Sequence, residues 1–117
     1  MAAKDTLGMR GEDQAARYLG ERGYRLIDRN WRCAFGEIDL VVEHGDETVF
    51  VEVKTRSSTA FGHPFEAITP RKLARLKRLA AAWCAQSERR TFSVRLDAIA
   101  VIGSGDDAVI EHLRGIG

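Results

Sequence analysis

Two short stretches of this chain carry charged side chains at alternate positions. The stretch Gly-Glu-Ile-Asp-Leu contains Asp39, and the stretch Phe-Val-Glu-Val-Lys contains Glu52 and Lys54. Carboxylate oxygens suit Mg²⁺ or Mn²⁺, which take oxygen ligands and keep several waters. A cation held by two carboxylates polarises a phosphoryl oxygen and acidifies a bound water, while an adjacent ammonium steadies the charge of the transition state. These residue types at this spacing suit hydrolysis of a phosphodiester bond.

A hairpin turn over His44–Glu47 would place the two stretches side by side, because its glycine permits the positive φ that such a turn needs. Asp39 then faces Glu52 across the two strands. By the same register, Glu37 faces Lys54. Side chains two positions apart share a face of a strand, so all four charged groups are expected on one side. The opposite side is expected to be a core face made of Ile38, Leu40, Val42, Val49, Val51 and Val53.

Two directly opposed carboxylates repel each other, and the sequence leaves open what relieves this repulsion. One interpretation is a divalent metal site. The other is a cross-strand ion-pair network in which Lys54 neutralises its neighbours. Glu37 is either a further ligand or an ion-pair partner of Lys54, and the ion pair is favoured. The absence of histidine from both stretches argues against zinc.

Hydrophobic periodicity predicts the elements that must position these side chains. Helices are expected over about residues 7–22 and 70–87, and strands over about 24–32, 36–44, 47–56 and 91–102, with a short edge strand within 106–114. Glu12 shares a helix face with Ala15 and Leu19, so it should point toward the side that packs. The order α-β-β-β-α-β predicts an α/β fold with a mixed sheet and flanking helices. A chain of 117 residues is expected to form a single domain over residues 1–117.

Basic residues dominate the segment that follows the acidic one. Glu37–Glu52 holds six acidic residues and no Lys or Arg, whereas Lys54–Arg78 holds seven basic residues and one acid. On the second helix, Arg71, Arg75 and Arg78 recur at helical spacing. The residues expected to hold a phosphate backbone without reading its sequence are Arg56, Arg71, Lys72, Arg75 and Arg78. Ordinary solvated surface is the alternative interpretation of such a run.

Composition excludes several classes of protein. Hydrophobic residues make up 44% and charged residues 30%, which excludes a disordered or collagen-like chain. The longest apolar run, Leu79–Ala85, is far short of the roughly 20 residues needed to span a bilayer, and no secretory signal is evident. Cys33 and Cys84 are too few for a disulfide scaffold and are expected as buried thiols. A cytoplasmic protein without a membrane partner is expected.

Three other residues have structural interpretations that outweigh functional ones. Trp83 lies on the apolar stripe of the second helix and is expected in the core. Asp97 is expected to be a structural partner of Arg95 or of a loop amide, and His63 an exposed loop residue.

The sequence as a whole resembles the small bacterial YraN-type family. The likeness runs from about Leu7 to Ile102 and is carried by Gly36–Leu40, Phe50–Arg56, Glu66–Thr69 and Lys72. Asp39 followed by Glu52-Val53-Lys54 on the next strand also resembles the motif of the PD-(D/E)xK nuclease superfamily. The YraN-type family is regarded as similar to archaeal Holliday-junction resolvases and restriction-like endonucleases, so the resemblance implies a restriction-endonuclease-like α-β-β-β-α-β core.

Carried over residue by residue, the resemblance implies Asp39 and Glu52 as metal ligands and Lys54 as the catalytic lysine. Glu12 matches the helix-one acid of the resolvase-like members and would complete the metal site. Ile38 stands where the nominal motif has a proline. The implied activity is that of a Mg²⁺- or Mn²⁺-dependent endonuclease on DNA, with branched or junction DNA as a candidate substrate.

Other classes of function stay open at this point. One is a non-catalytic nucleic-acid-binding module with a nuclease-like fold, and another is an interaction subunit whose acidic face binds a protein. DNA is favoured over RNA as the nucleic acid. A homodimer is compatible with a chain this small, which covers little DNA alone.

Overall fold

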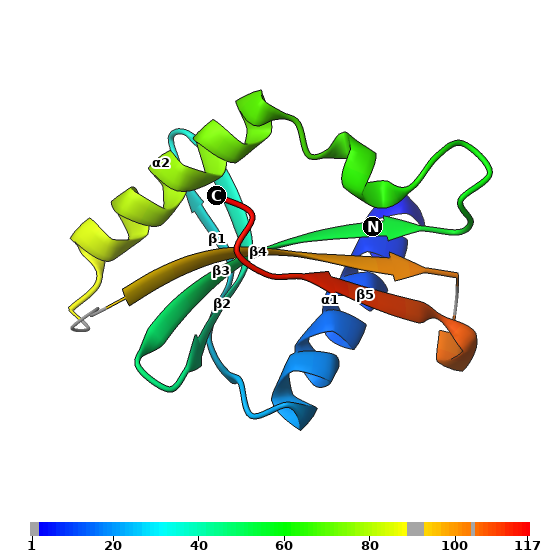
Figure 1. Ribbon diagram of the computed structural model, residues 1–117, viewed down its shortest axis with the longest axis horizontal. Coiled ribbons are helices and arrows are strands. Elements are labelled where there is room, and N and C mark those ends of the chain that lie inside the picture. Colours follow the sequence, from blue (N-terminus) through cyan, green and yellow to red (C-terminus); the bar gives the residue numbers. More distant parts are fainter. Residues whose placement is uncertain (1–2, 89–92, 104) are drawn as a thin grey trace.

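The computed structural model describes residues 3–88, 93–103 and 105–117 (Figure 1). Its elements are α1 (Ala3–Glu21), β1 (Arg25–Cys33), β2 (Gly36–His44), β3 (Glu47–Arg56), the 3₁₀-helix η1 (Pro64–Ala67), α2 (Pro70–Gln86), β4 (Ser93–Ile102), the 3₁₀-helix η2 (Gly105–Asp107) and β5 (Val109–Leu113). This order confirms the predicted α-β-β-β-α-β core and the short edge strand. Helix α1 begins earlier than expected, and η1 lies in what the sequence predicted as a loop. Residues 91 and 92 of the predicted fourth strand lie outside the described residues.

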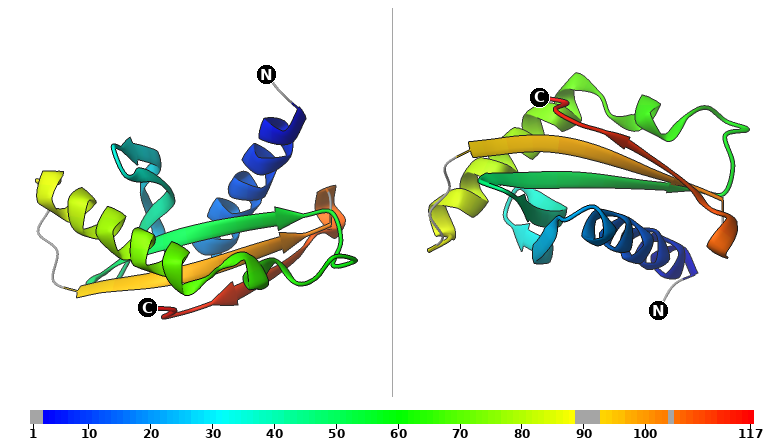
Figure 2. Two further views of the ribbon diagram at one scale, coloured as in Figure 1. Left: turned by 90° about the horizontal axis from the view of Figure 1, so that it is seen from above. Right: turned by 60° about the horizontal axis from the view of Figure 1, so that its bottom comes forward.

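The strands form one sheet in the order β1-β2-β3-β4-β5. Neighbours are antiparallel except β3 and β4, which are parallel and joined by the crossover that contains α2. Helices α1 and α2 cover opposite faces of this sheet (Figure 2). The predicted mixed sheet with flanking helices is therefore confirmed. Within the described part of the chain, no helix is long and apolar enough to cross a membrane.

Local sequence signals fix the ends of the elements that carry the candidate site. Gly23 has φ 87° where α1 stops, and Gly45 has φ 60° in the β2–β3 turn. Thr69 is the N-cap of α2, and its side chain accepts a hydrogen bond from the backbone N–H of Lys72. Pro70 occupies the first turn of that helix, where a missing N–H costs nothing.

Each face of the sheet has its own apolar cluster. Under α1 the buried residues are Ala15, Leu19, Tyr24, Leu40, Val42, Val49, Val51, Ile99 and Val101. Under α2 they are Ile38, Val41, Phe50, Leu76, Leu79, Ala80, Trp83 and Leu96. Residues 98–101 of β4 are fully buried, as expected for a strand covered on both faces. Trp83 lies in the core as predicted, whereas Cys33 and Cys84 are only half-buried free thiols.

The β1–β2 ribbon changes face partway along its length. Leu40 belongs to the cluster under α1 and Ile38 to the cluster under α2, although residues two apart normally share a face. On β1, Arg29 forms ion pairs with two acids of α1, while Trp31 packs under α2. Between them, Asn30 has φ 52°. The prediction that Ile38 and Leu40 lie on one core face is therefore wrong, because the ribbon twists between them.

This twist separates β2 from β3. The two strands pair from His44–Glu47 as far as Leu40–Val51, in the predicted register, and β2 then continues alongside β1 only. The β1–β2 turn reaches α2, where Gly36 lies near Leu79. The strands β2 and β3 thus form a fork that opens at Asp39.

Candidate functional site

Asp39 lies at the opening of the fork and bridges its two arms. Its Oδ2 accepts a hydrogen bond of 2.8 Å from the backbone N–H of Val53 on β3. Burial raises the pKa of Asp39 to about 7, and the charge of Glu52 raises it as well, against the lowering effect of the Val53 hydrogen bond. The charges of Glu12 and Glu37 add smaller increases. Four carboxyl groups therefore act on one another around this point.

Glu12 reaches the fork from α1, on the packed side as predicted. Its side chain is only 16% exposed, and Nε of Arg29 lies 3.6 Å from Oε1. That oxygen is buried and accepts no hydrogen bond from the described residues. Burial raises the pKa of Glu12, and the charge of Arg29 opposes this increase. Glu12 thus carries a buried carboxylate oxygen that has an ion-pair partner in Arg29 but no hydrogen bond from the part of the chain that the structure describes.

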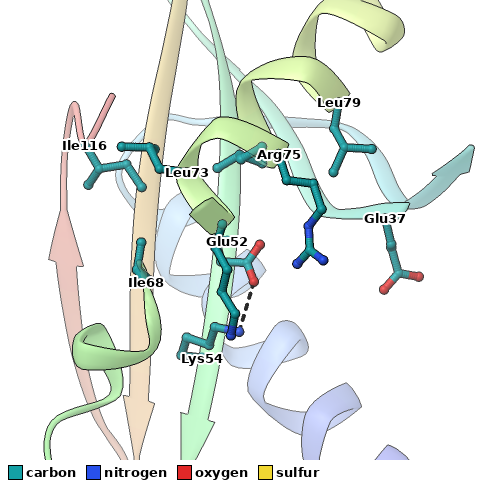
Figure 3. A pocket seen from close by; sticks show the side chains of 10 residues that line it. Glu37, Glu52, Lys54, Ile68, Leu73, Arg75, Leu79 and Ile116 are labelled. Carbon is teal, nitrogen blue, oxygen red and sulfur yellow. Dashed lines mark ion pairs between the residues drawn. The ribbon is translucent and has the colours of Figure 1, made fainter. Parts of the chain in front are cut away.

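Glu52 and Lys54 form the ion pair of the site. Nζ of Lys54 lies 3.1 Å from Oε1 of Glu52, and the two side chains are 19% and 23% exposed (Figure 3). The predicted pair between Glu37 and Lys54 is wrong, because Glu37 has left β3 together with β1. Nε of Arg32 on β1 lies 2.8 Å from Oε2 of Glu37 instead.

A small pocket connects this ion pair to α2. Its charged lining residues are Glu37, Glu52, Lys54, Lys72 and Arg75. Its apolar lining comes from Ile68, Leu73, Leu76, Leu79 and Ile116. Figure 3 shows the side chain of Arg75 extending from α2 into the space between Glu37 and Glu52. Two of the five predicted phosphate-binding residues, Lys72 and Arg75, are thus brought to the predicted catalytic pair.

The other predicted phosphate-binding residues lie outside this lining. Arg71 and Arg78 are exposed on α2. Arg56 is exposed at the end of β3 and donates a hydrogen bond to the backbone oxygen of Thr55. Their contact with nucleic acid stays a prediction.

The donor set around the fork fits a hard divalent cation. Across residues 3–88, 93–103 and 105–117, no group of three or more His, Cys, Asp or Glu side chains is arranged to hold a metal ion. Mg²⁺, however, commonly binds through one or two carboxylates and keeps its other ligands as water or phosphate oxygen. The buried Asp39, its neighbour Glu52 and the half-buried Glu12 supply such carboxylates. The assignment of these three residues as metal ligands stays a prediction.

A second buried acid shows what a fully compensated carboxylate looks like in this protein. Asp97 is fully buried and accepts two hydrogen bonds of 2.9 Å from Arg95. It also bonds Nε2 of His112 at 2.7 Å and the backbone N–H of Gly115 at 3.0 Å. Burial alone would raise the pKa of Asp97, but these hydrogen bonds lower it to about 2. The predicted structural pairing of Arg95 with Asp97 is confirmed.

Sequence reasoning missed two residues next to the fork. Arg29 lies 2.6 Å from Asp13 and 3.6 Å from Glu12, and the side chain of Asn30 lowers the pKa of the Glu12 carboxyl. The one sequence signal was an asparagine inside a strand, because asparagine is depleted in strands and tolerates the left-handed conformation.

His63 was also expected to be a plain loop residue, but it caps η1 and its Nε2 lies 2.8 Å from Glu111.

Comparison with known proteins places this chain among close relatives. A family model described as uncharacterised protein family UPF0102 matches residues 11–101, a range that contains every candidate site residue. A UPF0102 protein of Arthrobacter sp. (strain FB24) is 56% identical over 118 aligned positions, covering 100% of both chains. A second, from Beutenbergia cavernae, is 53% identical with the same coverage. A third, from Leifsonia xyli subsp. xyli, is 53% identical and covers 99% of each chain.

Proposed function

The chain belongs to the uncharacterised protein family UPF0102, and on that premise we propose that it is a Mg²⁺- or Mn²⁺-dependent endonuclease that hydrolyses phosphodiester bonds in DNA. The observation that carries the proposal is the fork. There Glu12, Asp39 and Glu52 influence one another electrostatically, and Lys54 lies 3.1 Å from Glu52. The same residue types in the same order underlie the resemblance to PD-(D/E)xK nucleases and archaeal junction resolvases.

The contrast with Asp97 favours a cation site over a structural ion-pair network. Asp97 is surrounded by donors, and its pKa falls to about 2. Asp39 is surrounded by acids, and its pKa rises to about 7. Lys54 compensates Glu52, and Arg29 is shared between Glu12 and Asp13. Among the described residues, no such cation offsets Asp39. Negative charge at the fork therefore exceeds what the protein compensates, as expected where a divalent cation binds.

Each residue of the site has a definite part in this proposal. Asp39 and Glu52, with Glu12, would hold Mg²⁺ or Mn²⁺, which when bound supplies a Lewis acid and an acidified water. Glu52 keeps the ammonium of Lys54 in place, and its half-buried position strengthens its electrostatic effect. Lys54 can then orient a water or stabilise charge on the reacting phosphate. Lys72 and Arg75, which line the same pocket, can hold a neighbouring phosphate.

The substrate class follows from the basic residues and the resemblance. Contacts from arginine and lysine to phosphates carry no sequence information, so the proposed enzyme would select DNA by its structure. Branched and junction DNA are the structures to test first. A cytoplasmic location, where such DNA would be met, and a homodimer belong to the same proposal. A binding module without turnover is the alternative, but it would not need the Glu52–Lys54 pair.

Cleavage assays with matched variants test this function. Plasmid, single-stranded, flap and four-way-junction DNA, and RNA, would be incubated with protein in Mn²⁺ or in EDTA. Asp39→Asn keeps an oxygen that can accept from Val53, and Lys54→Met keeps the length of the side chain, so both should fold. We expect cleavage only with Mn²⁺, and a loss on the order of 100-fold or more in both variants.

Two control variants change the same kinds of residue elsewhere. Asp46→Asn removes an exposed turn carboxylate, and Lys77→Met removes an exposed lysine of α2. Both should cleave like the wild type. If Lys54→Met cleaves as fast as the wild type, the activity comes from a contaminant and the enzyme proposal fails. DNA binding without cleavage of any substrate would instead favour the binding module.

A further inference from the structure

Asn30 has a backbone conformation that its place in the fold does not explain by itself. Among the described residues, it is the one non-glycine residue with positive φ, at 52°. Asparagine tolerates this left-handed region better than most residues, but it usually does so in turns. Asn30 lies inside strand β1. A non-glycine residue held in a sparsely populated conformation within a strand points to a local constraint.

The register of the ribbon places Asn30 opposite Asp39. Arg29 pairs with Leu40, and Trp31 pairs with Ile38. Asn30 lies between the two β1 residues and Asp39 between the two β2 residues, so Asn30 and Asp39 face each other. On β2, Leu40 packs under α1 and Ile38 under α2. On β1, Arg29 pairs with acids of α1, whereas Trp31 packs under α2. The left-handed turn of the backbone at Asn30 accompanies the twist that takes β2 away from β3. The fork therefore opens where Asn30 and Asp39 face each other.

The side chain of Asn30 links this position to α1. It lies close enough to the carboxylate of Glu12 to lower the pKa of that group, and Arg29 contacts the same carboxylate. An amide donor beside a carboxylate can restrain the rotation of that carboxylate. Oε1 of Glu12 is buried, has Nε of Arg29 3.6 Å away and accepts no hydrogen bond from the described residues. Asn30 thus faces Asp39 across the ribbon and also lies beside Glu12, which approaches Asp39 from α1.

We infer that Asn30 is a positioning residue of the site: its left-handed backbone opens the fork at Asp39, and its amide orients Glu12 toward that fork. The inference rests on the proposed function, since it assigns Asn30 a role toward the cation-binding carboxylates. Arg29 neutralises Glu12 and Asp13, whereas the uncharged amide of Asn30 directs Glu12 without removing its charge.

Substitution by glycine separates the two contributions. Asn30→Gly allows the left-handed φ at little cost but removes the amide, so the fold should persist. Asn30→Ala removes the amide and also disfavours the backbone conformation. Gln14→Ala is the matched control, because it removes an amide of α1 that donates to the backbone oxygen of Gly105. Circular dichroism and thermal unfolding would first establish that each variant is folded.

Mn²⁺ binding in the absence of DNA, followed by electron paramagnetic resonance, provides a readout independent of cleavage. We expect Asn30→Gly to raise the half-saturating Mn²⁺ concentration about 10-fold, the usual effect of losing a residue that orients a ligand. The kcat for DNA cleavage should fall by a similar factor. KM for DNA should stay unchanged, because the basic residues of α2 are intact. Gln14→Ala should match the wild type in all three quantities.

A double-mutant cycle tests whether Asn30 acts through Glu12. In a Glu12→Gln background, Asn30→Gly should cause no further loss of Mn²⁺ binding, since the orientation of an absent carboxylate no longer matters. Equal losses in both backgrounds would overturn the inference, as would wild-type Mn²⁺ binding and kcat in Asn30→Gly. If the wild type binds Mn²⁺ and cleaves while Asn30→Gly does the same, only this inference fails. If the wild type does neither, the proposed function fails and this inference with it.

Discussion

Asp39 and Asp97 are chemically identical side chains with opposite environments. Asp97 has an arginine, a histidine and a backbone N–H around it, so its ionised form is favoured and its pKa is about 2. Asp39 has burial and the charge of Glu52 against it, and its pKa is about 7. Folding therefore stabilises the charge of one aspartate and opposes the charge of the other. Such an opposed group in a folded protein is a frequent mark of a functional site.

The unfavourable ionisation of Asp39 should lower the free energy of unfolding of the metal-free protein. Because the pKa of Asp39 is raised from 3.8 to about 7, its ionisation opposes folding increasingly as pH rises between these values. Asp39→Asn, which cannot ionise, should therefore be more stable than the wild type at pH 8 in EDTA, by on the order of 2 kcal/mol. The difference should shrink as pH falls from 7 toward 4. Urea unfolding at several pH values measures it.

Asp97→Asn is the control with the opposite sign. Its pKa is lowered from 3.8 to about 2, so ionised Asp97 contributes stability above pH 4 that is lost as pH falls through 2. Asp97→Asn should be less stable than the wild type at pH 7, by about 3 kcal/mol, because it leaves Arg95 without its buried partner. If both variants lower stability equally at pH 8, the ionisation of Asp39 does not oppose folding and this explanation is wrong.

At the scale of elements, the close approach of α1 to β3 brings Glu12 to the fork. Gly11 is buried, and a Cβ there would collide with Oγ1 of Thr55 on β3. The missing side chain lets the helix backbone lie directly on the strand that carries Glu52 and Lys54. The neighbouring Glu12 can then extend into the fork from the helix.

Substitution of this glycine should damage the site through the helix position. Gly11→Ala should push α1 away from β3, lower stability by about 1–3 kcal/mol, and weaken Mn²⁺ binding together with cleavage. Gly20→Ala, on the same helix, meets nothing within 4 Å and should be neutral or stabilising by up to about 1 kcal/mol. Thermal unfolding and Mn²⁺ titration measure both effects. Wild-type Mn²⁺ binding in a folded Gly11→Ala protein would contradict this account of Glu12.

The sequence predicts these elements well where local chemistry decides them. The turn glycine and the alternation beyond it predict the pairing of β2 with β3 as far as Leu40–Val51. The prediction fails from there onward, because the ribbon twists to pack Trp31 and Ile38 under α2. A strict period of two cannot foresee that change of face, since it depends on a helix formed later in the chain. Glu37 therefore pairs with Arg32 and not with Lys54.

In the candidate site, too, the sequence predicts what local patterns determine and misses what contacts between distant elements determine. Spacing and resemblance correctly bring Glu52 and Lys54 together, and helical periodicity turns Glu12 toward the packed side. Neither predicts Arg29 or Asn30, because their contacts with Glu12 join β1 to α1 in three dimensions. Contacts between side chains of different elements carry no regular sequence signal.

At the scale of the whole molecule, a net charge of +1 conceals an uneven distribution of charge. The acids of the site come from α1, β2 and β3, and the exposed Arg71, Arg75 and Arg78 lie along α2. Such an arrangement would let DNA bind through phosphates while its cleavage point rests at the acidic fork.

The proposed contacts to DNA predict a measurable salt dependence. Asp39→Asn protein in EDTA would bind DNA without cleaving it, and the logarithm of its affinity should fall linearly with the logarithm of salt concentration. Arg71→Ala and Arg78→Ala should each reduce that slope by about 1 and weaken binding to all sequences equally. Arg17→Ala, on α1, should leave the slope unchanged. Fluorescence anisotropy measures these affinities, and identical slopes in every variant would contradict the assigned surface.

The crossover that makes β3 and β4 parallel neighbours also determines when, during synthesis, the candidate site is complete. The second helix reaches the fork as part of that crossover, and β4 closes the sheet beside β3 only after the helix has been made. A nascent chain that has emerged only through Lys54 already contains the carboxylates and the lysine of the candidate site, yet it lacks the α2 helix and the β4 strand that pack around them. Under the proposed nuclease function, cleavage would then begin only late in synthesis, and incomplete chains would not cut DNA.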